Sequence, residues 1–265
     1  MKRVAAKFVL HLLTEEQNNK CVNVCCFAGR AQNNPHSLTE VITADESWCY
    51  SYDPESKQQS GQWKSPDSPR PKTVLQVHSS IKTMLISFFD VDGILHREFV
   101  PPGQTINQQF YLNVVKSLHE RLWRKCPEEW QSGDWFLHRD NAPAHTALSV
   151  QQFLAKNKMV AGGSVPPLTP TPYSPDLTPC YFVLYPRVKQ NLKGKHFVDV
   201  AEVQWESPVA LDSISIEVFR QCFQQWEQHW HRCVPSKGLK FQICMNISNK
   251  FFLTIPEILA MIVNY

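Results

Sequence analysis

The chain has 265 residues and a mass of 30.6 kDa, enough for one sizeable core with appendages. Its hydrophobic content of 43% is ordinary for a globular protein, so we expect one principal domain. The net charge of +3 allows a nucleic-acid partner without requiring one, because phosphate-binding proteins usually cluster Lys and Arg more densely. No run of Lys and Arg indicates a basic tail.

The cysteines and the two ends of the chain bear on its cellular context. Nine cysteines form an odd, scattered set without a regular framework, which favours reduced thiols inside the cell. His11 interrupts the short apolar stretch near the start, and no small-residue cleavage site follows, so we expect no signal peptide. Residues 251–265 are apolar, but the stretch is only 15 residues long and contains Pro256. We therefore expect a loosely attached tail and no membrane span.

Strand-forming residues dominate the first part of the chain. Residues 41–52, VITADESWCYSY, are rich in β-branched and aromatic residues and predict a strand with Asp45 inside it. The pair Asp92-Gly93 supplies turn chemistry before the last of three further strands. These strands are predicted at residues 74–79, 83–90 and 93–100, and they complete a β-meander.

Helices then alternate with strand, as in an α/β layer. Thr105 and Gln108 match a capping box at the start of an amphipathic helix. Residues 135–138 predict a short apolar strand that leads to Asp140. Apolar residues at helical spacing mark the buried faces of this helix and of the next one: Phe110, Val114, Leu118 and Leu122, then Ala147, Val150, Phe153 and Leu154.

Glycine and proline interrupt this alternation. Residues 162–172, GGSVPPLTPTP, predict a loop, because glycine is conformationally too free and proline lacks an amide donor. Residues 178–194 predict a helix. A final helix carries a heavy aromatic stripe: Phe219, Cys222, Phe223, Trp226 and Trp230.

Asp45 and Asp140 are the acids that point to chemistry. Each is associated with a predicted strand, and two neighbouring strands would bring both carboxylates to one edge of a sheet. Mg²⁺ and Mn²⁺ prefer oxygen ligands, and a two-metal site activates water and stabilises the leaving oxygen of a phosphodiester. Such sites usually need three or four acids, and an Asp at a strand end is more often a solvated residue or a cap. Spacing alone leaves both interpretations open.

Other clusters have structural explanations that we prefer. His229 and His231 are two residues apart on a predicted helix, so their side chains point to different faces. Cys21, Cys25 and Cys26 lack a second CxxC-type pair, which argues against a zinc site. Five tryptophans could stack on bases, but burial is the default expectation for them: Trp48, Trp63, Trp135, Trp226 and Trp230.

Four strings carry a resemblance to a known family: TADESW, PPGQTINQQFY, HRDNAPAH and YSPDLTPCYF. In order and approximate spacing they resemble mariner-type transposases of the Tc1/mariner superfamily, over roughly residues 3–241. The resemblance implies an α/β fold of the RNase H-like (retroviral-integrase-like) type, with a mixed sheet flanked by helices. It divides the chain into a remnant of an inter-domain linker (1–40), a catalytic domain (41–240) and an unrelated tail (241–265). From the resemblance we expect no counterpart of the family's N-terminal helix-turn-helix modules in this sequence.

The resemblance also assigns the family's three metal-binding aspartates. Asp45 matches the first and Asp140 the second, so both are expected as catalytic residues and metal ligands. Tyr181 occupies the third position, and the loop at 162–172 makes its interval from Asp140 longer than the family's spacing. A neutral phenol offers Mg²⁺ one poor oxygen and no charge. Asp176 is expected to be a turn or cap residue, because the family has an Asp there in addition to its ligands.

Three side chains flank Asp140 in the HRDNAPAH string: His138, Asn141 and His145. In one interpretation they orient the site or contact DNA. In the other they cap the following helix.

The function implied by the resemblance is metal-dependent DNA cleavage and strand transfer with Mg²⁺ or Mn²⁺, impaired here by Tyr181. Loss of the ligand, the inserted loop and the foreign tail favour a transposon remnant or a host-adopted derivative. Expected partners are DNA, a second copy of the chain and host proteins through fusion or association, in the nucleus and without a membrane. The alternatives are a non-enzymatic DNA-binding or dimerising scaffold and a non-functional relic.

Overall fold

The computed structural model describes the central part of the chain and one segment before it. The described residues are 14–31, 38–55, 60, 63, 65, 67–69, 77–125, 135–140, 142–159 and 177–237. The predicted loop at 162–172 and the predicted tail at 241–265 lie outside the described residues, as do Asn141 and Asp176.

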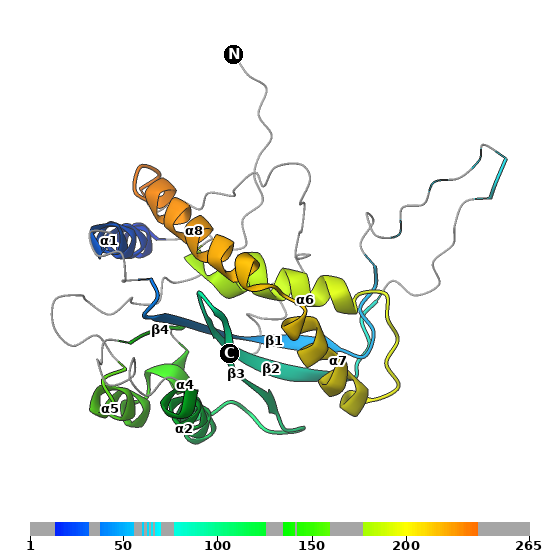
Figure 1. The fold of residues 1–265 in the computed structure, drawn as a ribbon, viewed down its shortest axis with the longest axis horizontal. Helices are drawn as coiled ribbons and strands as arrows, with labels where there is room; N and C mark the ends of the chain where they lie inside the picture. The colour runs from blue at the N-terminus through cyan, green and yellow to red at the C-terminus, as the bar shows by residue number, and fades with distance from the viewer. Residues whose placement is uncertain are drawn as a thin grey trace, which may run out of the picture.

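A four-stranded mixed sheet forms the centre of the fold (Figure 1). Its strands are β1 (Val41–Tyr50), β2 (Lys82–Asp90), β3 (Gly93–Val100) and β4 (Phe136–His138). In the order β3-β2-β1-β4, β2 pairs antiparallel with β1 and with β3, whereas β4 pairs parallel with β1. The predicted mixed α/β architecture and the strands predicted at 83–90 and 93–100 are confirmed.

The strand predicted at residues 74–79 is wrong over its described part, which is irregular from Val77 onward. The Ser79 amide donates to the Tyr52 carbonyl at 3.0 Å, and the Ser51 hydroxyl donates to the Ser79 hydroxyl at 2.7 Å. Both partners lie just after β1 and far from Ser79 in sequence, so residues 77–79 are held by these tertiary contacts and not by a regular ladder.

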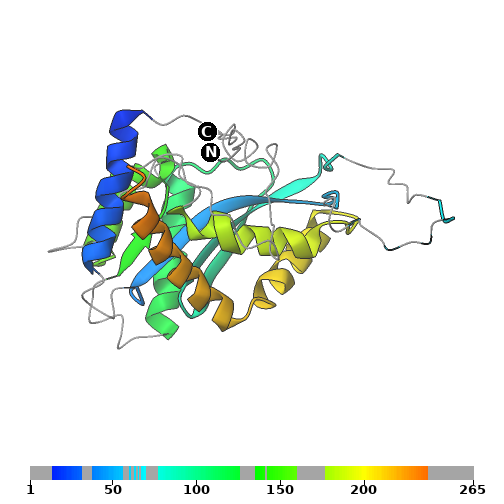
Figure 2. The same cartoon turned by 90° about the horizontal axis from the view of Figure 1, so that it is seen from above.

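Helices cover both faces of the sheet (Figures 1 and 2). One face carries α2 (Gln108–Lys125), α4 (Pro143–Thr146) and α5 (Leu148–Lys156). The other carries the π-helical turn η2 (Cys180–Leu184), α6 (Tyr185–Leu192), α7 (Val200–Asp212) and α8 (Ile216–Cys233), with α1 (Glu15–Ala31) beside α8. Because both faces are covered, β1 is buried along most of its length.

The two faces of β1 contribute to two separate cores. Val41 packs in the core formed with α6, α7 and α8, whereas Ala44 packs in the core formed with α2 and α5. Successive side chains of a strand point to opposite faces. Asp45 therefore lies on the α6 side of the sheet, and Glu46 lies on the α2 side.

Helix α2 has the apolar face that the sequence predicts. Three of the four predicted positions are buried, Val114, Leu118 and Leu122, whereas Phe110 is half-buried. The helix begins at Gln108, and the Asn107 side chain accepts a hydrogen bond from the Phe110 amide at 2.9 Å. The capping box predicted at Thr105 is therefore wrong. Asn is a favourable cap because its short side chain reaches the unpaired amides of the first turn.

Helix α8 buries the predicted aromatic stripe. The stripe residues are all buried: Phe219, Cys222, Phe223, Trp226 and Trp230. The Trp226 indole donates to the Leu177 carbonyl at 2.8 Å, which ties α8 to the residues just before η2. His229 is buried and His231 is exposed, so the expectation that they face different ways is confirmed.

The spacing of apolar residues does not predict helix α7 (Val200–Asp212). Trp205 is exposed, and Pro208 lies inside the helix. A capping signal marks its start instead, because the Asp199 side chain accepts a hydrogen bond from the Glu202 amide at 2.8 Å. An acid followed three residues later by Glu, as at Asp199 and Glu202, indicates a helix start that apolar periodicity does not reveal.

Helix α1 lies inside the region predicted as a linker remnant, residues 1–40. Cys21 and Cys25 are four residues apart, and both are buried in the core that contains Cys233 of α8. This part of the predicted linker is thus packed against the domain that follows it. In the part of the chain that the structure covers, no helix combines the length and apolarity needed to cross a bilayer.

Replacing Trp226 with Phe should destabilise the fold. The change keeps most of the apolar area but removes the N–H that the buried Leu177 carbonyl accepts, and we expect a loss of roughly 1–3 kcal/mol in the free energy of unfolding. Urea denaturation measures this loss. The control is Trp205→Phe, at an exposed position, which should change the free energy by less than about 0.5 kcal/mol. Equal stability of the two variants would contradict the assigned role of the indole.

Candidate active site

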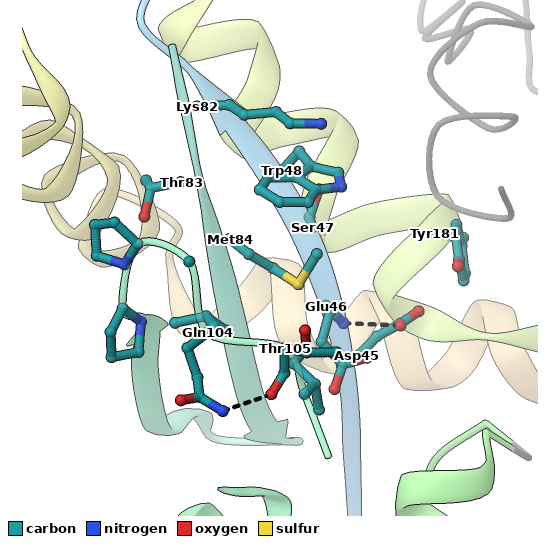
Figure 3. Close-up of a pocket in the computed structure, with 15 residues that line it drawn as sticks. Asp45, Glu46, Ser47, Trp48, Lys82, Thr83, Met84, Gln104, Thr105 and Tyr181 are labelled. Carbon is teal, nitrogen blue, oxygen red and sulfur yellow. Dashed lines mark hydrogen bonds between the residues drawn. The ribbon is translucent and has the colours of Figure 1, made fainter. Parts of the chain in front are cut away.

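Asp45 lies in the middle of β1, where two elements fix its backbone. It pairs with Ser87 of β2, and its carbonyl accepts a hydrogen bond from the Tyr185 hydroxyl of α6. Its Oδ1 accepts a hydrogen bond from the Glu46 amide at 2.8 Å. Figure 3 shows this carboxyl on the side of β1 that faces Tyr181. The acid is thus presented from a rigid strand.

The parallel register of β4 on β1 sets the place of Asp140. Thr43 of β1 is aligned with His138 of β4, and the Thr43 hydroxyl lies 3.3 Å from His138 Nδ1. Asp45 and Asp140 each follow this pair by two residues, so the alignment carries both acids to the same end of the strand pair. Their carboxylates are near enough to interact electrostatically. The structure therefore brings together the two acids that the sequence singles out, and their catalytic role stays a prediction.

Asp140 itself lies in the turn between β4 and α4. Its Oδ1 accepts a hydrogen bond from the Ala142 amide at 3.1 Å and contacts Nδ1 of His145. His145 is buried on α4, and the Arg139 guanidinium donates to its carbonyl. Of the two interpretations of the flanking histidine, the contact with Asp140 favours orientation of the site over helix capping.

Glu46 is an acid of the site that the sequence analysis missed. It follows Asp45 in β1, so its side chain points to the opposite face, toward α2 and α4. Its Oε1 lies 3.3 Å from Nε2 of His145, and the Tyr111 ring of α2 packs on that imidazole with ring centroids 3.9 Å apart. Adjacent acids in a strand buried on both faces are the signal that marks it, because each face then receives one charge.

Two of the three acids of the cluster, Asp45 and Glu46, are buried. Asp45 is 6% exposed, and its Oδ2 has no hydrogen-bond partner among the described residues. Burial, reinforced by the Glu46 and Asp140 carboxylates, raises the pKa of Asp45 well above its usual value. Burial lowers the pKa of His145, but the same two carboxylates outweigh this effect and raise it to about 10. His145 is therefore a cation at neutral pH, and a further cation near Asp45 would relieve the remaining repulsion.

Tyr181 stands at the position that the resemblance assigns to a third ligand. It lies in η2 next to Cys180, whose thiol is 4.0 Å from the Thr43 hydroxyl. Burial raises the pKa of Tyr181 above its usual value, and the Asp45 and Asp140 carboxylates raise it further, so the phenol stays neutral. Tyr181 and Asp45 line the same hollow (Figure 3).

The side chains present fit one divalent cation better than two. Asp45 and Asp140 offer the hard oxygen ligands that Mg²⁺ and Mn²⁺ prefer, and Oδ2 of Asp45 lacks a partner within the described residues. No group of three or more His, Cys, Asp or Glu side chains in the described ranges is arranged to hold a metal ion. The two acids are thus compatible with one weakly held cation, whereas a two-metal site would lack its third carboxylate at Tyr181.

A hollow of about 450 Å³ opens beside Asp45 and Glu46 (Figure 3). Asp45 and Tyr181 are among the residues that line it, and so are Val100 at the end of β3 and residues 101–106 that follow. Lys82 Nζ lies 3.9 Å from the centroid of the Trp48 ring, and both residues border the hollow. A ligand that enters therefore meets carboxylates, a cation and an aromatic face.

Burial differs among the tryptophans and cysteines considered from the sequence. Three of the five tryptophans considered above are buried, as expected for large aromatic side chains: Trp135, Trp226 and Trp230. Trp48 is half-buried, and Trp63 is fully exposed, so the expected burial is wrong for Trp63. Cys21 and Cys25 are buried in the core and carry no disulfide, whereas the Cys26 side chain lies outside the described residues.

Two curated proteins resemble the chain in sequence. Residues 53–132 match the family described as "Transposase (partial DDE domain)". The histone-lysine N-methyltransferase SETMAR of Homo sapiens is 29% identical over 239 residues, which cover 89% of this chain and 33% of that protein. The mariner Mos1 transposase of Drosophila mauritiana is 27% identical over 234 residues, which cover 88% of this chain and 65% of that protein. The chain thus spans less than two thirds of either relative.

Solved structures of the Mos1 transposase share the fold. The Mos1 mariner paired end complex with Mn aligns with a TM-score of 0.78 and 26% identity, covering 91% of this chain and 68% of that chain. The catalytic domain of Mos1 aligns with a TM-score of 0.70 and 24% identity, covering 89% of this chain and 100% of that chain. The second alignment shows that the fold is that of the catalytic domain, which confirms the predicted RNase H-like class.

Replacing Asp45 with Asn should stabilise the metal-free fold. Asn keeps an acceptor for the Glu46 amide but removes a buried carboxyl whose ionised form is disfavoured by burial and by two neighbouring carboxylates. We expect the free energy of unfolding at pH 8 in EDTA to rise by roughly 0.5–2 kcal/mol, measured by denaturant titration. The control is Glu120→Gln, an exposed acid on α2, which should leave stability nearly unchanged. A loss of stability in Asp45→Asn would show that the charge is already compensated.

Proposed function

Since the chain carries a mariner-type transposase catalytic region with an RNase H-like fold, we propose that its ancestral activity is metal-dependent DNA cleavage and strand transfer, impaired in this chain. The observation that carries the proposal is the neutral Tyr181 beside Asp45 and Asp140. A chain of this kind is a transposon remnant or a host-adopted derivative.

Asp45 and Asp140 are the residues that would hold a Mg²⁺ or Mn²⁺ ion. Support comes from Oδ2 of Asp45, buried and without a partner among the described residues, and from Mos1 paired end complexes with Mn and with Mg. When bound, such a cation would act as a Lewis acid on the scissile phosphodiester. The contribution of the chain's own residues is to position the two ligands. Strand β1 fixes Asp45, while the Ala142 amide and His145 orient Asp140.

Tyr181 supports the impaired state because its phenol does not supply the charge of a carboxylate. Its raised pKa keeps the phenol neutral, so it contributes one oxygen and no negative charge. The neighbouring Cys180 does not compensate, because burial raises the pKa of its thiol well above the usual value. A cation held by Asp45 and Asp140 alone is bound more weakly than one held by three acids.

DNA is the proposed substrate. Mos1 is known in a paired-end complex with the left transposon end. In this chain, Lys82 and Trp48 border the hollow beside the acids, and cationic and aromatic groups together suit unpaired nucleotides. A nuclear location, self-association and association with host proteins are further parts of the proposal, and they rest on the resemblance.

Nicking of supercoiled DNA by the purified chain tests the proposal. Tyr181→Asp should raise the Mn²⁺-dependent nicking rate at least about 100-fold over the parent chain, because a restored carboxylate strengthens charge stabilisation by the cation. Tyr181→Phe keeps the ring without adding a ligand and should stay at the parent level. Adding Asp45→Asn to Tyr181→Asp should return the rate to background.

The other outcomes have distinct meanings. Strong nicking by the parent chain that Asp45→Asn abolishes would contradict the impairment. If every variant is inert but folded and binds DNA in EDTA, the scaffold interpretation replaces the proposal. A broad melting transition in all variants would instead indicate a non-functional relic.

A further inference from the structure

One buried imidazole connects the acids on the two sides of β1. Nδ1 of His145 contacts Oδ1 of Asp140, and its Nε2 lies 3.3 Å from Oε1 of Glu46. His145 is 2% exposed, and the Tyr111 ring covers it with centroids 3.9 Å apart. With both nitrogens engaged and one face covered, the ring is held in one orientation.

Asp140 needs support from outside the sheet. β4 ends at His138, so Asp140 lies beyond the last residue pair of this strand, and its side chain is 39% exposed. The Ala142 amide and His145 both engage the same oxygen, Oδ1. Two contacts to the same oxygen fix the direction in which the Asp140 carboxyl points.

Glu46, by contrast, is fixed by the sheet. It pairs with Ile86 of β2 in the middle of the β1–β2 ladder, and its side chain is buried. The far side of His145 is therefore anchored on a central strand that also carries Asp45. A rigid connection runs from β1 through Glu46 and His145 to Asp140.

We propose that Glu46 and His145 are a positioning pair that holds the Asp140 carboxyl in the orientation in which it and Asp45 bind a divalent cation. The inference rests on the proposed function, because it takes Asp45 and Asp140 as the ligands. The pair acts through Asp140 and does not itself contact the cation. Residues that orient metal ligands in this way typically contribute about 10–100-fold to metal affinity.

Stability alone does not account for the pair. Oε2 of Glu46 is buried without a hydrogen-bond partner among the described residues. Burial of paired charges usually costs about as much as the pairing returns, and apolar side chains of similar volume are often equally stable or better. A packing role at Glu46 and His145 would therefore not require ionisable side chains.

Substitution of His145 by Asn or by Gln distinguishes a role in positioning Asp140 from a role in packing. The test uses the full 265-residue chain with Tyr181→Asp, and it measures the Mn²⁺ dissociation constant from the EPR signal of free Mn²⁺. Asn places its amide nitrogen near Nδ1 and keeps the donor to Asp140, whereas Gln places it near Nε2 and keeps only the contact with Glu46. We expect His145→Gln to weaken binding by about 10–100-fold and His145→Asn to weaken it distinctly less. Packing predicts the reverse order, because Gln fills the space of His better.

His96 supplies a matched control. It is buried like His145, and its Nε2 also lies 3.3 Å from a glutamate oxygen, that of Glu98, but it lies on β3, two strands away from β1. His96→Gln should leave the Mn²⁺ affinity unchanged. Glu46→Gln removes the charge that anchors His145 and should weaken binding by about 10-fold. Circular dichroism and a cooperative melt check the fold of every variant.

The outcomes separate this inference from the proposed function. If Asp45→Asn and Asp140→Asn leave Mn²⁺ binding unchanged in the Tyr181→Asp chain, the proposed function fails. If they weaken binding but His145→Gln does not, or if His145→Asn binds no better than His145→Gln, the positioning role is overturned and the cation site stands. Should a His145 variant lose its cooperative melt, Glu46→Gln decides, and unchanged affinity in that variant also overturns the inference.

Discussion

Burial of β1 on both faces is the constraint on which the rest of this structure depends. The strand lies between β2 and β4, and helices cover it above and below, so alternating side chains enter two different cores. Asp45 and Glu46 therefore place a carboxyl in each core. A buried acid requires a donor or a cation, and on the α2 side that cation is His145. On the α6 side, the buried Oδ2 of Asp45 has no such partner among the described residues, and Asp45 is one of the residues that line the hollow.

Sequence periodicity predicts the elements whose stability comes from one regular apolar face. Helices α2 and α8 are of this kind, and their buried stripes follow the predicted spacing. Elements fixed by polar contacts are less accessible to this reasoning. The start of α2 depends on the Asn107 side chain, α7 begins at a cap on Asp199 and exposes Trp205, and the region at Ser79 is irregular because of hydrogen bonds between residues distant in sequence.

The site divides in the same way. Asp45 and Asp140 are visible in the sequence because both are acids next to strand-forming residues, and parallel pairing explains why they meet. The significance of Tyr181 comes only from the resemblance, since nothing local marks a tyrosine as a missing ligand. The contact between Glu46 and His145 could not be predicted at all, because it depends on side-chain alternation in β1 together with the placement of α4.

Under the proposed function, Tyr181 lowers the catalytic activity of the site without destabilising the fold. A third carboxylate would add like charge to a buried site where Asp45 is already poorly compensated, whereas the Tyr181 ring adds apolar area and stays neutral. Without a cation, the chain with Tyr181 should be at least as stable as one with three acids. The support of Asp140 by His145 lies toward the opposite face of β1 and does not involve Tyr181. The architecture and most of the cation site can therefore persist after the ligand is lost, because the interactions that maintain them do not pass through it.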